Sequence, residues 1–304
     1  MKQLLVRAEK VPSYGDPLLE EKIFSLLETL GASRLSGERV LLKPNWVSFR
    51  QAELSCTHPA VLQAVCKALV EAGAKVSVGD SPAFGSTAQV ARASRAQEAL
   101  RSLPVRIVKF TAGPTERLPC GVKVRLAKEA VEADVIVNVP RFKAHCQLLL
   151  TLAVKNFFGC VVGLQKPLLH AKIGHEGDLF PQMLLEVAQS FPRRINLLDA
   201  VVAMEGWGPT GGRPRSLGFL LGAEDPVALD TAVYAALELR PEEVPLWRVA
   251  QRAGLPGAFP QNVRAEGLPD LRGFALPETL TPITFNPLRL LKGLLKRLRD
   301  RLFR

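Results

Sequence analysis

Four short apolar runs alternate with segments of helical periodicity along the chain. The runs occupy residues 38–42, 75–79, 133–139 and 194–202. Between the first two runs, Pro59 precedes apolar residues spaced three to four apart, which is typical of the first turn and buried face of a helix. This alternation predicts an α/β fold with a mainly parallel sheet that is flanked by helices.

The pattern is weaker between residues 92 and 130, where Gly and Pro interrupt a helix and two short strand patterns. This stretch is consistent with an inserted flap or a small second lobe. We therefore expect an α/β domain over residues 1–275, with one or two lobes. A Pro-containing linker and a tail helix are expected over residues 276–304.

Polar side chains follow each of the four predicted strands. In open α/β sheets, ligands usually bind beyond the carboxyl ends of parallel strands, so these residues would meet in one cleft if the strands are neighbours. The polar residues and one glycine at the strand ends are Lys43, Asn45, Asp80, Ser81, Arg141, Lys143, His145, Asp199, Glu205 and Gly206.

The segment from Asn138 to Gly163 is the most informative part of the chain. Pro140 has no N–H group and is expected to end the strand before it, so we predict a functional loop here. Lys155 and Asn156 lie further along, and Lys155 interrupts an apolar stretch where a charge is costly unless it has a partner. Several cations beside an imidazole and carboxamides predict a pocket for a carboxylate or phosphate.

Two histidines are candidates for acid–base catalysis, because imidazole changes its charge near neutral pH. His145 belongs to the segment just described, and His170 lies among further cations in a region that we expect to be a loop. In this hypothesis Lys43, Lys143 and Lys155 bind the anion. Their neighbours Asn45 and Asn156 orient it.

Four carboxylates suggest a second possibility, a site for Mg²⁺. No compact ligand motif supports it, and each acid could instead pair with a nearby lysine. Asp225 is expected to cap the helix that begins at Pro226, whereas capping does not explain the fourth acid, which lies one turn further on. The metal candidates are Asp80, Asp199, Glu205 and Asp230.

The formal net charge of +11 is concentrated at the end of the chain. From Asn286 onward there are seven Lys or Arg residues and one Asp, with leucines at helical spacing. A basic amphipathic helix of this kind suits an anionic membrane surface, its own domain or a second subunit in a homodimer. The tail lacks the interleaved aromatic residues that stack on bases, which argues against nucleic acid.

No apolar run approaches the ~18 residues that a membrane span requires, and the first residues do not resemble a secretory signal. A cytoplasmic location is therefore expected, with peripheral contact at the inner face of a membrane as an option. The five cysteines are widely spaced and contain no C-x-x-C pair, which argues against a disulfide framework or a self-contained iron–sulfur motif.

Several of these motifs occur together in a known family. The sequences LKPN at residues 42–45, VGDSP at 78–82, NVPRFKAH at 138–145, VKNFFGC at 154–160 and DPVALD at 225–230 resemble the Domain of Unknown Function 362 family over about residues 38–245. Members are often associated with ferredoxin-like iron–sulfur segments. This chain has no such cysteine cluster, so the resemblance implies the fold and the cleft and leaves the reaction open.

Three hypotheses follow from the sequence. The first is an enzyme that acts on a small anionic metabolite. The second is a redox or assembly protein that takes an iron–sulfur cluster from a partner through Cys146 and Cys160. The third is a scaffold that binds the membrane surface through its tail.

Overall fold

One mixed sheet of ten strands organises the chain in the computed structural model, which describes residues 3–163 and 165–281. The strands are β1 (Leu4–Lys10), β2 (Arg39–Pro44), β3 (Lys75–Asp80), β4 (Arg106–Lys109), β7 (Val135–Val139), β8 (Arg141–His145), β9 (Leu149–Thr151), β10 (Arg194–Glu205), β11 (Arg213–Ala223) and β12 (Val263–Glu266).

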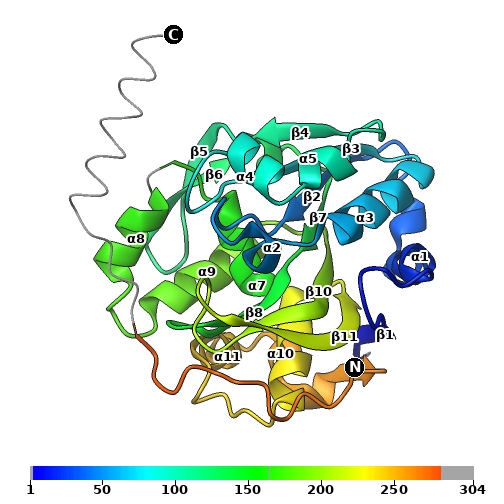
Figure 1. The fold of residues 1–304 in the computed structure, drawn as a ribbon. Coiled ribbons are helices and arrows are strands. Elements are labelled where there is room, and N and C mark those ends of the chain that lie inside the picture. The colour runs from blue at the N-terminus through cyan, green and yellow to red at the C-terminus, as the bar shows by residue number, and fades with distance from the viewer. Residues whose placement is uncertain (1–2, 164, 282–304) are drawn as a thin grey trace.

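The strand order is β12-β1-β11-β10-β7-β2-β3-β4, and β8 and β9 join the sheet beside β10 (Figure 1). The five neighbours from β10 to β4 are all parallel, whereas β1 and β11 add antiparallel pairs. This confirms the predicted α/β class with a mainly parallel central sheet.

Helices cover both faces of the sheet. The α-helices are α1 (Leu19–Thr29), α2 (Ala52–Ser55), α3 (Pro59–Glu71), α4 (Thr87–Ala93), α5 (Ala96–Ala99), α6 (Lys128–Val131), α7 (Ala153–Asn156), α8 (Gln165–Ile173), α9 (Leu179–Gln189), α10 (Pro226–Ala236) and α11 (Pro245–Arg252). Short 3-10 helices are η1 (Ala32–Arg34), η2 (Phe157–Cys160), η3 (Pro256–Ala258) and η4 (Pro260–Asn262). None of the helices in the described ranges has the length and apolar character to cross a bilayer.

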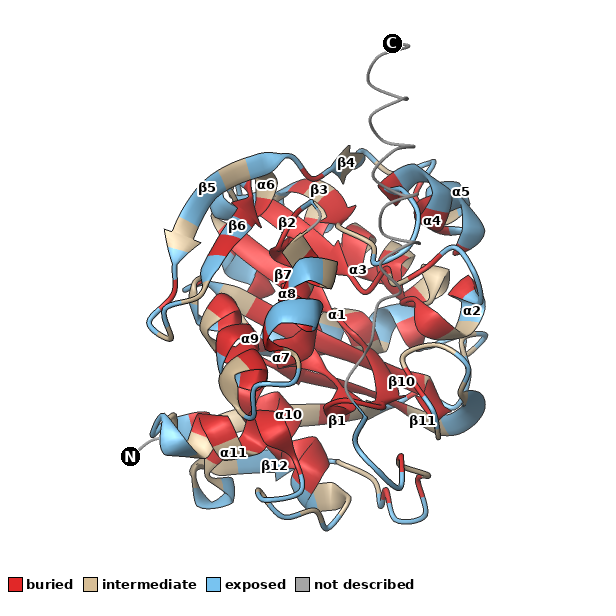
Figure 2. Cartoon of the chain, turned by 90° about the vertical axis from the view of Figure 1, so that its left-hand side faces the viewer, coloured by how far each residue is buried: buried red, intermediate tan, exposed pale blue. Residues whose placement is uncertain are grey.

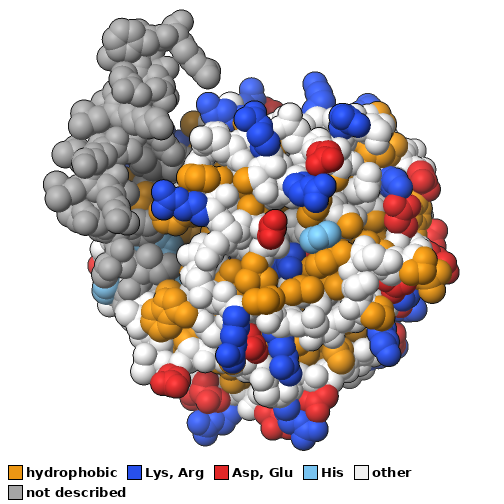
Figure 3. Space-filling model, viewed as in Figure 1, with side chains coloured by type: hydrophobic (Ala, Val, Ile, Leu, Met, Phe, Trp, Pro, Cys, Tyr) orange, Lys and Arg blue, Asp and Glu red, His pale blue; other side chains and the backbone are white. Residues whose placement is uncertain are grey.

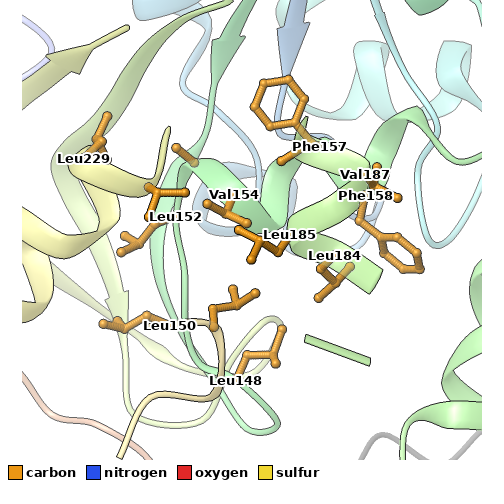
Figure 4. Packing of buried hydrophobic residues seen from close by; sticks show 14 of the residues in the cluster. Leu148, Leu150, Leu152, Val154, Phe157, Phe158, Leu184, Leu185, Val187 and Leu229 are labelled. Atoms are coloured by element: carbon orange, nitrogen blue, oxygen red, sulfur yellow. The ribbon is translucent and has the colours of Figure 1, made fainter. Parts of the chain in front are cut away.

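Alternation along the strands divides the core in two. Val40 and Leu42 of β2 pack in the same cluster as α1 and α3, while Leu41 faces the cluster of α7, α9 and α10. Buried residues accordingly fill the sheet and the inner faces of the helices (Figure 2). Figure 4 shows how α7 and η2 bring Val154 and Phe158 against α9.

Local sequence explains the helix that follows β2. His58 caps α3 by accepting from the backbone N–H of Ala60 at 3.3 Å, and Pro59 occupies the first turn, as predicted. After the helix, Gly73 adopts a positive φ of 80°, which an L side chain would strain. The chain can therefore turn sharply into β3.

Two expectations need correction. The segment from Asn138 to Gly163 is not a loop, because after Pro140 the chain continues as β8, β9, α7 and η2, almost all buried. Pro140 ends β7, but it does not end the sheet, since β8 pairs in parallel with β10. His170 lies in α8 and not in a loop.

The segment expected as a flap, residues 92–130, has two parts. β4 is an edge strand of the main sheet, whereas β5 (Ala112–Arg117) and β6 (Lys123–Ala127) form a separate two-stranded sheet. A linker and a tail helix were expected over residues 276–304. Residues 276–281 are described, and the part from residue 282 onward lies outside the described residues.

Candidate functional site

The predicted polar residues converge because their strands are neighbours. β10, β7, β2 and β3 lie side by side, and β8 continues from β7 at the same edge. Most of these side chains are buried and do not line an open cleft: Lys43, Lys143 and Asp199 have no exposed surface. Buried charges are expensive, so the partners of each group indicate its role.

Lys43 at the end of β2 forms an ion pair with Asp80 at the end of β3. The Nζ to Oδ1 distance is 3.0 Å, and Asp80 Oδ2 accepts from the backbone N–H of Trp46 at 2.8 Å. The backbone N–H of Ser81 also donates to Asp80 Oδ1, at 2.8 Å. Gly159 of η2 lies over this pair so closely that an added Cβ would be 2.0 Å from Asp80 Oδ1. The pair is therefore satisfied and tightly covered.

Arg141 and Asp199 form a second buried pair, with an Nη1 to Oδ2 distance of 3.0 Å. Asp199 also accepts from the Tyr14 hydroxyl at 2.8 Å and from the His58 backbone N–H at 3.0 Å. Burial and the neighbouring Asp199 carboxylate raise the pKa of Tyr14, so its hydroxyl remains a donor. This pair links β8 and β10 to the start of α3.

Lys143 begins a chain of buried amide groups. Its Nζ donates to Asn45 Oδ1 and to the Ser55 carbonyl. Asn45 then donates to Asn156 at 2.7 Å, and Asn156 donates to Asn138 at 2.8 Å. Burial lowers the pKa of Lys143 to about 7. The Lys143 amine nevertheless has hydrogen-bond partners within the protein.

Lys155 of α7 has a different environment. Its side chain is only 9% exposed, and its Nζ lies 4.6 Å from the ring centre of Phe158 and 5.0 Å from that of Phe180. Within the described ranges we find no hydrogen bond and no ion pair to this Nζ. Burial, together with the nearby cation Lys166, lowers the pKa of Lys155 to about 7.

Two histidines lie beside Lys155. His145 Nδ1 accepts from the backbone N–H groups of Gln147 at 3.1 Å and Leu148 at 3.2 Å, which leaves the ring proton on Nε2. His170 Nδ1 lies 3.1 Å from Gln147 Oε1, and its ring packs on Phe158 and Phe180. Burial lowers the pKa of both, with His170 at about 2, so both are neutral at physiological pH.

We call Lys155, Lys166, His145 and His170 the basic cluster. Lys166 of α8 donates from Nζ to the Ser81 carbonyl, which connects α8 to the end of β3. Lys166 is the charged neighbour of Lys155, and no carboxylate contacts Lys155 in the described part of the chain. The cluster can therefore accept an anion.

Glu205 and Gly206, the last of the predicted strand-end residues, lie at the end of β10. Glu205 forms an ion pair with Arg213 at 2.9 Å and accepts from the backbone N–H of Ala275, while the Gly206 N–H donates to the Ala275 carbonyl at 2.7 Å. These contacts fix the strand end against the segment that precedes Thr281.

Asp230 has a structural role that the sequence left unexplained. Its carboxylate accepts from the backbone N–H groups of Ala153 at 2.8 Å and Val154 at 3.1 Å, at the first turn of α7. Burial raises the pKa of Asp230 well above its usual value. Asp225 caps α10 as predicted, accepting from Val227 and Ala228. Asp230 therefore holds the helix that carries Lys155.

The metal candidates lie apart and are engaged individually. Within residues 3–163 and 165–281, no three His, Cys, Asp or Glu side chains come together as a metal site. Burial raises the pKa of the Cys146 thiol, and that of Cys160 to about 12, which disfavours the thiolate that an iron–sulfur cluster needs. The described residues give a metal or cluster no support.

Sequence reasoning missed several partners. Asn138 Nδ2 donates to Asn196 Oδ1 at 2.9 Å, and the single amide in the otherwise apolar strand β7 was a signal that could have identified Asn138. Phe180 and Tyr14 come from distant segments and carry no local signal.

A hollow of about 390 Å³ lies between α10 and β12, and none of the predicted site residues lines it.

Known proteins place this arrangement in a family. The model of the family described as Domain of unknown function (DUF362) matches residues 40–235, which include both ion pairs and the basic cluster. The chain belongs to the DUF362 family. The resemblance inferred from the sequence motifs is thereby confirmed.

One curated relative supports the assignment. This DUF362 chain is 38% identical over 294 residues to "Thylakoid-associated protein sll1697" of Synechocystis, a match that covers 93% of this chain and 91% of the relative. Among solved structures, this chain is similar to the lactate racemase apoprotein of Thermoanaerobacterium thermosaccharolyticum, with a TM-score of 0.48 and 13% identity. That alignment covers 78% of this chain and 58% of the racemase chain.

Proposed function

We propose that this DUF362 protein is an enzyme that binds a small carboxylate or phosphate at the basic cluster. The observation that carries the proposal is Lys155, a buried amine between two aromatic rings with no anionic partner in the described residues. A buried ammonium group is unfavourable without a counter-charge, and a bound anion would supply one.

The basic cluster changes the roles expected from sequence. Lys43 and Lys143 already have partners, so in this proposal they hold the sheet edge together. Lys155 binds the anion. The neutral His145 presents its Nε2 proton as a donor, and Asn45 and Asn156 fix the position of β8 and α7 through their amide chain.

Lys155 is also suited to proton transfer. Because its pKa is about 7, both its charged and neutral forms are populated near neutral pH. An anion that binds beside it would favour the charged form, which can then donate a proton to the ligand. This gives the enzyme hypothesis a specific acid–base group.

Thermal unfolding with sulfate, phosphate or oxalate tests the anion site, at an ionic strength held constant with chloride. We expect one or more of these anions to raise the Tm of the wild-type protein but not of Lys155→Met. Lys172→Met, an exposed lysine on the adjacent α8, is the matched control and should behave as wild type. Equal stabilisation of Lys155→Met would contradict the proposal.

The proposed location is cytoplasmic, with the protein peripheral to the inner face of a membrane. The relative's association with thylakoids supports membrane contact, as does the basic amphipathic pattern from Asn286 onward. The tail residues lie outside the described ranges. A homodimer remains a further prediction, and comparison of the mass in solution with that of one chain would check it.

A further inference from the structure

Exposed large hydrophobic side chains are concentrated at one edge of the molecule. Seven occur in the described residues, and five of them lie on segments that border the carboxyl edge of the sheet. We call these five the apolar rim: Phe49, Phe84, Leu168, Trp207 and Leu280, with exposed fractions of 41%, 51%, 58%, 51% and 40%. The other two are Leu18 and Val131.

Contacts between the loops after β2 and β3 bring Phe49 and Phe84 of the apolar rim together. The backbone N–H of Phe84 donates to the Val47 carbonyl at 3.1 Å, and Phe84 forms a parallel bridge with Ser48. Phe49 packs beside Gly85, where an added Cβ would lie 2.8 Å from its ring. The loops after β2 and β3 therefore present their aromatic side chains together.

Further contacts bring in the other rim segments. Gln51 accepts from the backbone N–H of Gly211 at 3.0 Å, which joins the loop after β2 to the loop that carries Trp207. The backbone N–H of Cys146 donates to the Gly208 carbonyl at 3.0 Å, and the Cys146 carbonyl accepts from the backbone N–H of Thr281 at 2.7 Å, beside Leu280. Lys166 links α8, which carries Leu168, to Ser81.

Charge around the apolar rim favours an anionic partner. The rim segments 47–53, 81–89, 165–172, 206–215 and 275–281 contain five Lys or Arg and two Glu residues. Figure 3 shows hydrophobic side chains gathered in the region where α2 lies, with Lys and Arg side chains nearby. The described chain ends at Thr281 on this edge, and the basic, leucine-rich sequence follows directly.

We propose that the apolar rim is a docking surface for an anionic lipid bilayer. Aromatic side chains insert at the level of the headgroups, and the surrounding Arg and Lys side chains contact lipid phosphates. The inference deepens the proposed membrane location and is independent of the anion site. It gives the folded domain its own contact with lipid, besides the tail, and it orients the carboxyl edge of the sheet toward the membrane.

Trp207 provides a direct probe in the full-length protein. The chain has three tryptophans, and Trp46 and Trp247 are only 1% and 4% exposed. Vesicles of phosphatidylcholine with about 30 mol% phosphatidylglycerol should therefore shift the emission of Trp207 to shorter wavelength. The shift should be absent in Trp207→Phe and weaker with pure phosphatidylcholine vesicles.

Flotation with the same vesicles tests the rim against the tail. Phe84→Asp/Trp207→Asp should lower vesicle binding at least about tenfold, because it places two charges at the lipid contact. Leu18→Asp/Val131→Asp is the matched control and should bind as wild type. Unchanged binding by the rim variant, with loss only in Leu291→Asp/Leu295→Asp of the tail, would overturn the docking surface while leaving tail attachment intact.

Two other occupants would also contradict the inference. If a second copy covers the rim, the rim variant will reduce the mass in solution without changing lipid binding. If the chain's own tail covers it, Trp207 will emit at short wavelength without vesicles, and the tail variant will shift that emission to longer wavelength.

Discussion

Lys43 and Lys155 are both buried lysines at the same edge of the sheet, yet their surroundings are opposite. Lys43 has a carboxylate at 3.0 Å, a carbonyl at 3.1 Å and a glycine packed over the pair. Lys155 has two aromatic rings and cationic or neutral basic neighbours. The difference teaches that burial of a charge alone does not mark a binding residue, and we therefore base the proposed anion site on the buried lysine that has no counter-charge in the described residues.

The same distinction applies to Arg141 and Asp199, which satisfy each other within the protein. A family motif can therefore contain two kinds of charged residue. One kind holds the neighbouring strands together, and we propose that the other binds a ligand.

Replacing each of the two lysines with Met should give the largest difference in the free energy of unfolding. Lys43→Met leaves Asp80 buried without its cation and should lower the free energy of unfolding by about 3–5 kcal/mol. Lys155→Met removes a buried amine that has no hydrogen-bond or ion-pair partner in the described structure, so the change in the free energy of unfolding should be below about 1 kcal/mol or stabilising. Urea unfolding followed by circular dichroism measures both.

The double variant Lys43→Met/Asp80→Leu is the control for this contrast. It removes both charges and should recover part of the loss seen in Lys43→Met. A large loss of stability in Lys155→Met, equal to that of Lys43→Met, would show that Lys155 is also a structural cation.

Gly159→Ala should have a smaller effect on the free energy of unfolding. The new methyl group would meet Asp80 Oδ1 at 2.0 Å and Lys43 Nζ at 2.5 Å, so η2 or the ion pair must move. We expect a loss of about 1–3 kcal/mol in urea unfolding. Gly15→Ala is the control, because its nearest neighbour, Ser13 Oγ, is 3.8 Å away. Equal stability of the two variants would show that the cover over the pair is loose.

The fold and the convergence of strand ends could be predicted from the sequence because they depend on local patterns. The apolar strands, the proline of α3 and the Asp225 cap all act within a few residues. The partner of each charged side chain could not be predicted in this way. Asp80 lies 37 residues from Lys43, and Phe180 lies 25 residues from Lys155, so only the packed structure shows which charge is paired.

The error over residues 138–163 has the same origin. Pro140 breaks one strand, as its chemistry requires, but β8 then finds a second partner in β10. Tertiary pairing of this kind leaves no signal in a short window of sequence.

A further predicted effect is the pH dependence of anion binding. The pKa of Lys155 in the free protein is about 7, and only its protonated form attracts an anion. Affinity for sulfate, whose charge is constant from about pH 6 to 9, should be level below pH 7 and fall about tenfold per pH unit above it. Calorimetric titration of the wild-type protein measures this, and an affinity that is unchanged up to pH 9 would exclude Lys155 as the titrating group.

The most direct test of the central claim is a crystal grown without sulfate and then soaked in selenate, whose anomalous scattering locates the anion. We predict a selenium peak within hydrogen-bonding distance of Lys155 Nζ and none beside Lys43 or Arg141. Peaks only at the surface, or a peak that persists at the same position in Lys155→Met, would contradict it.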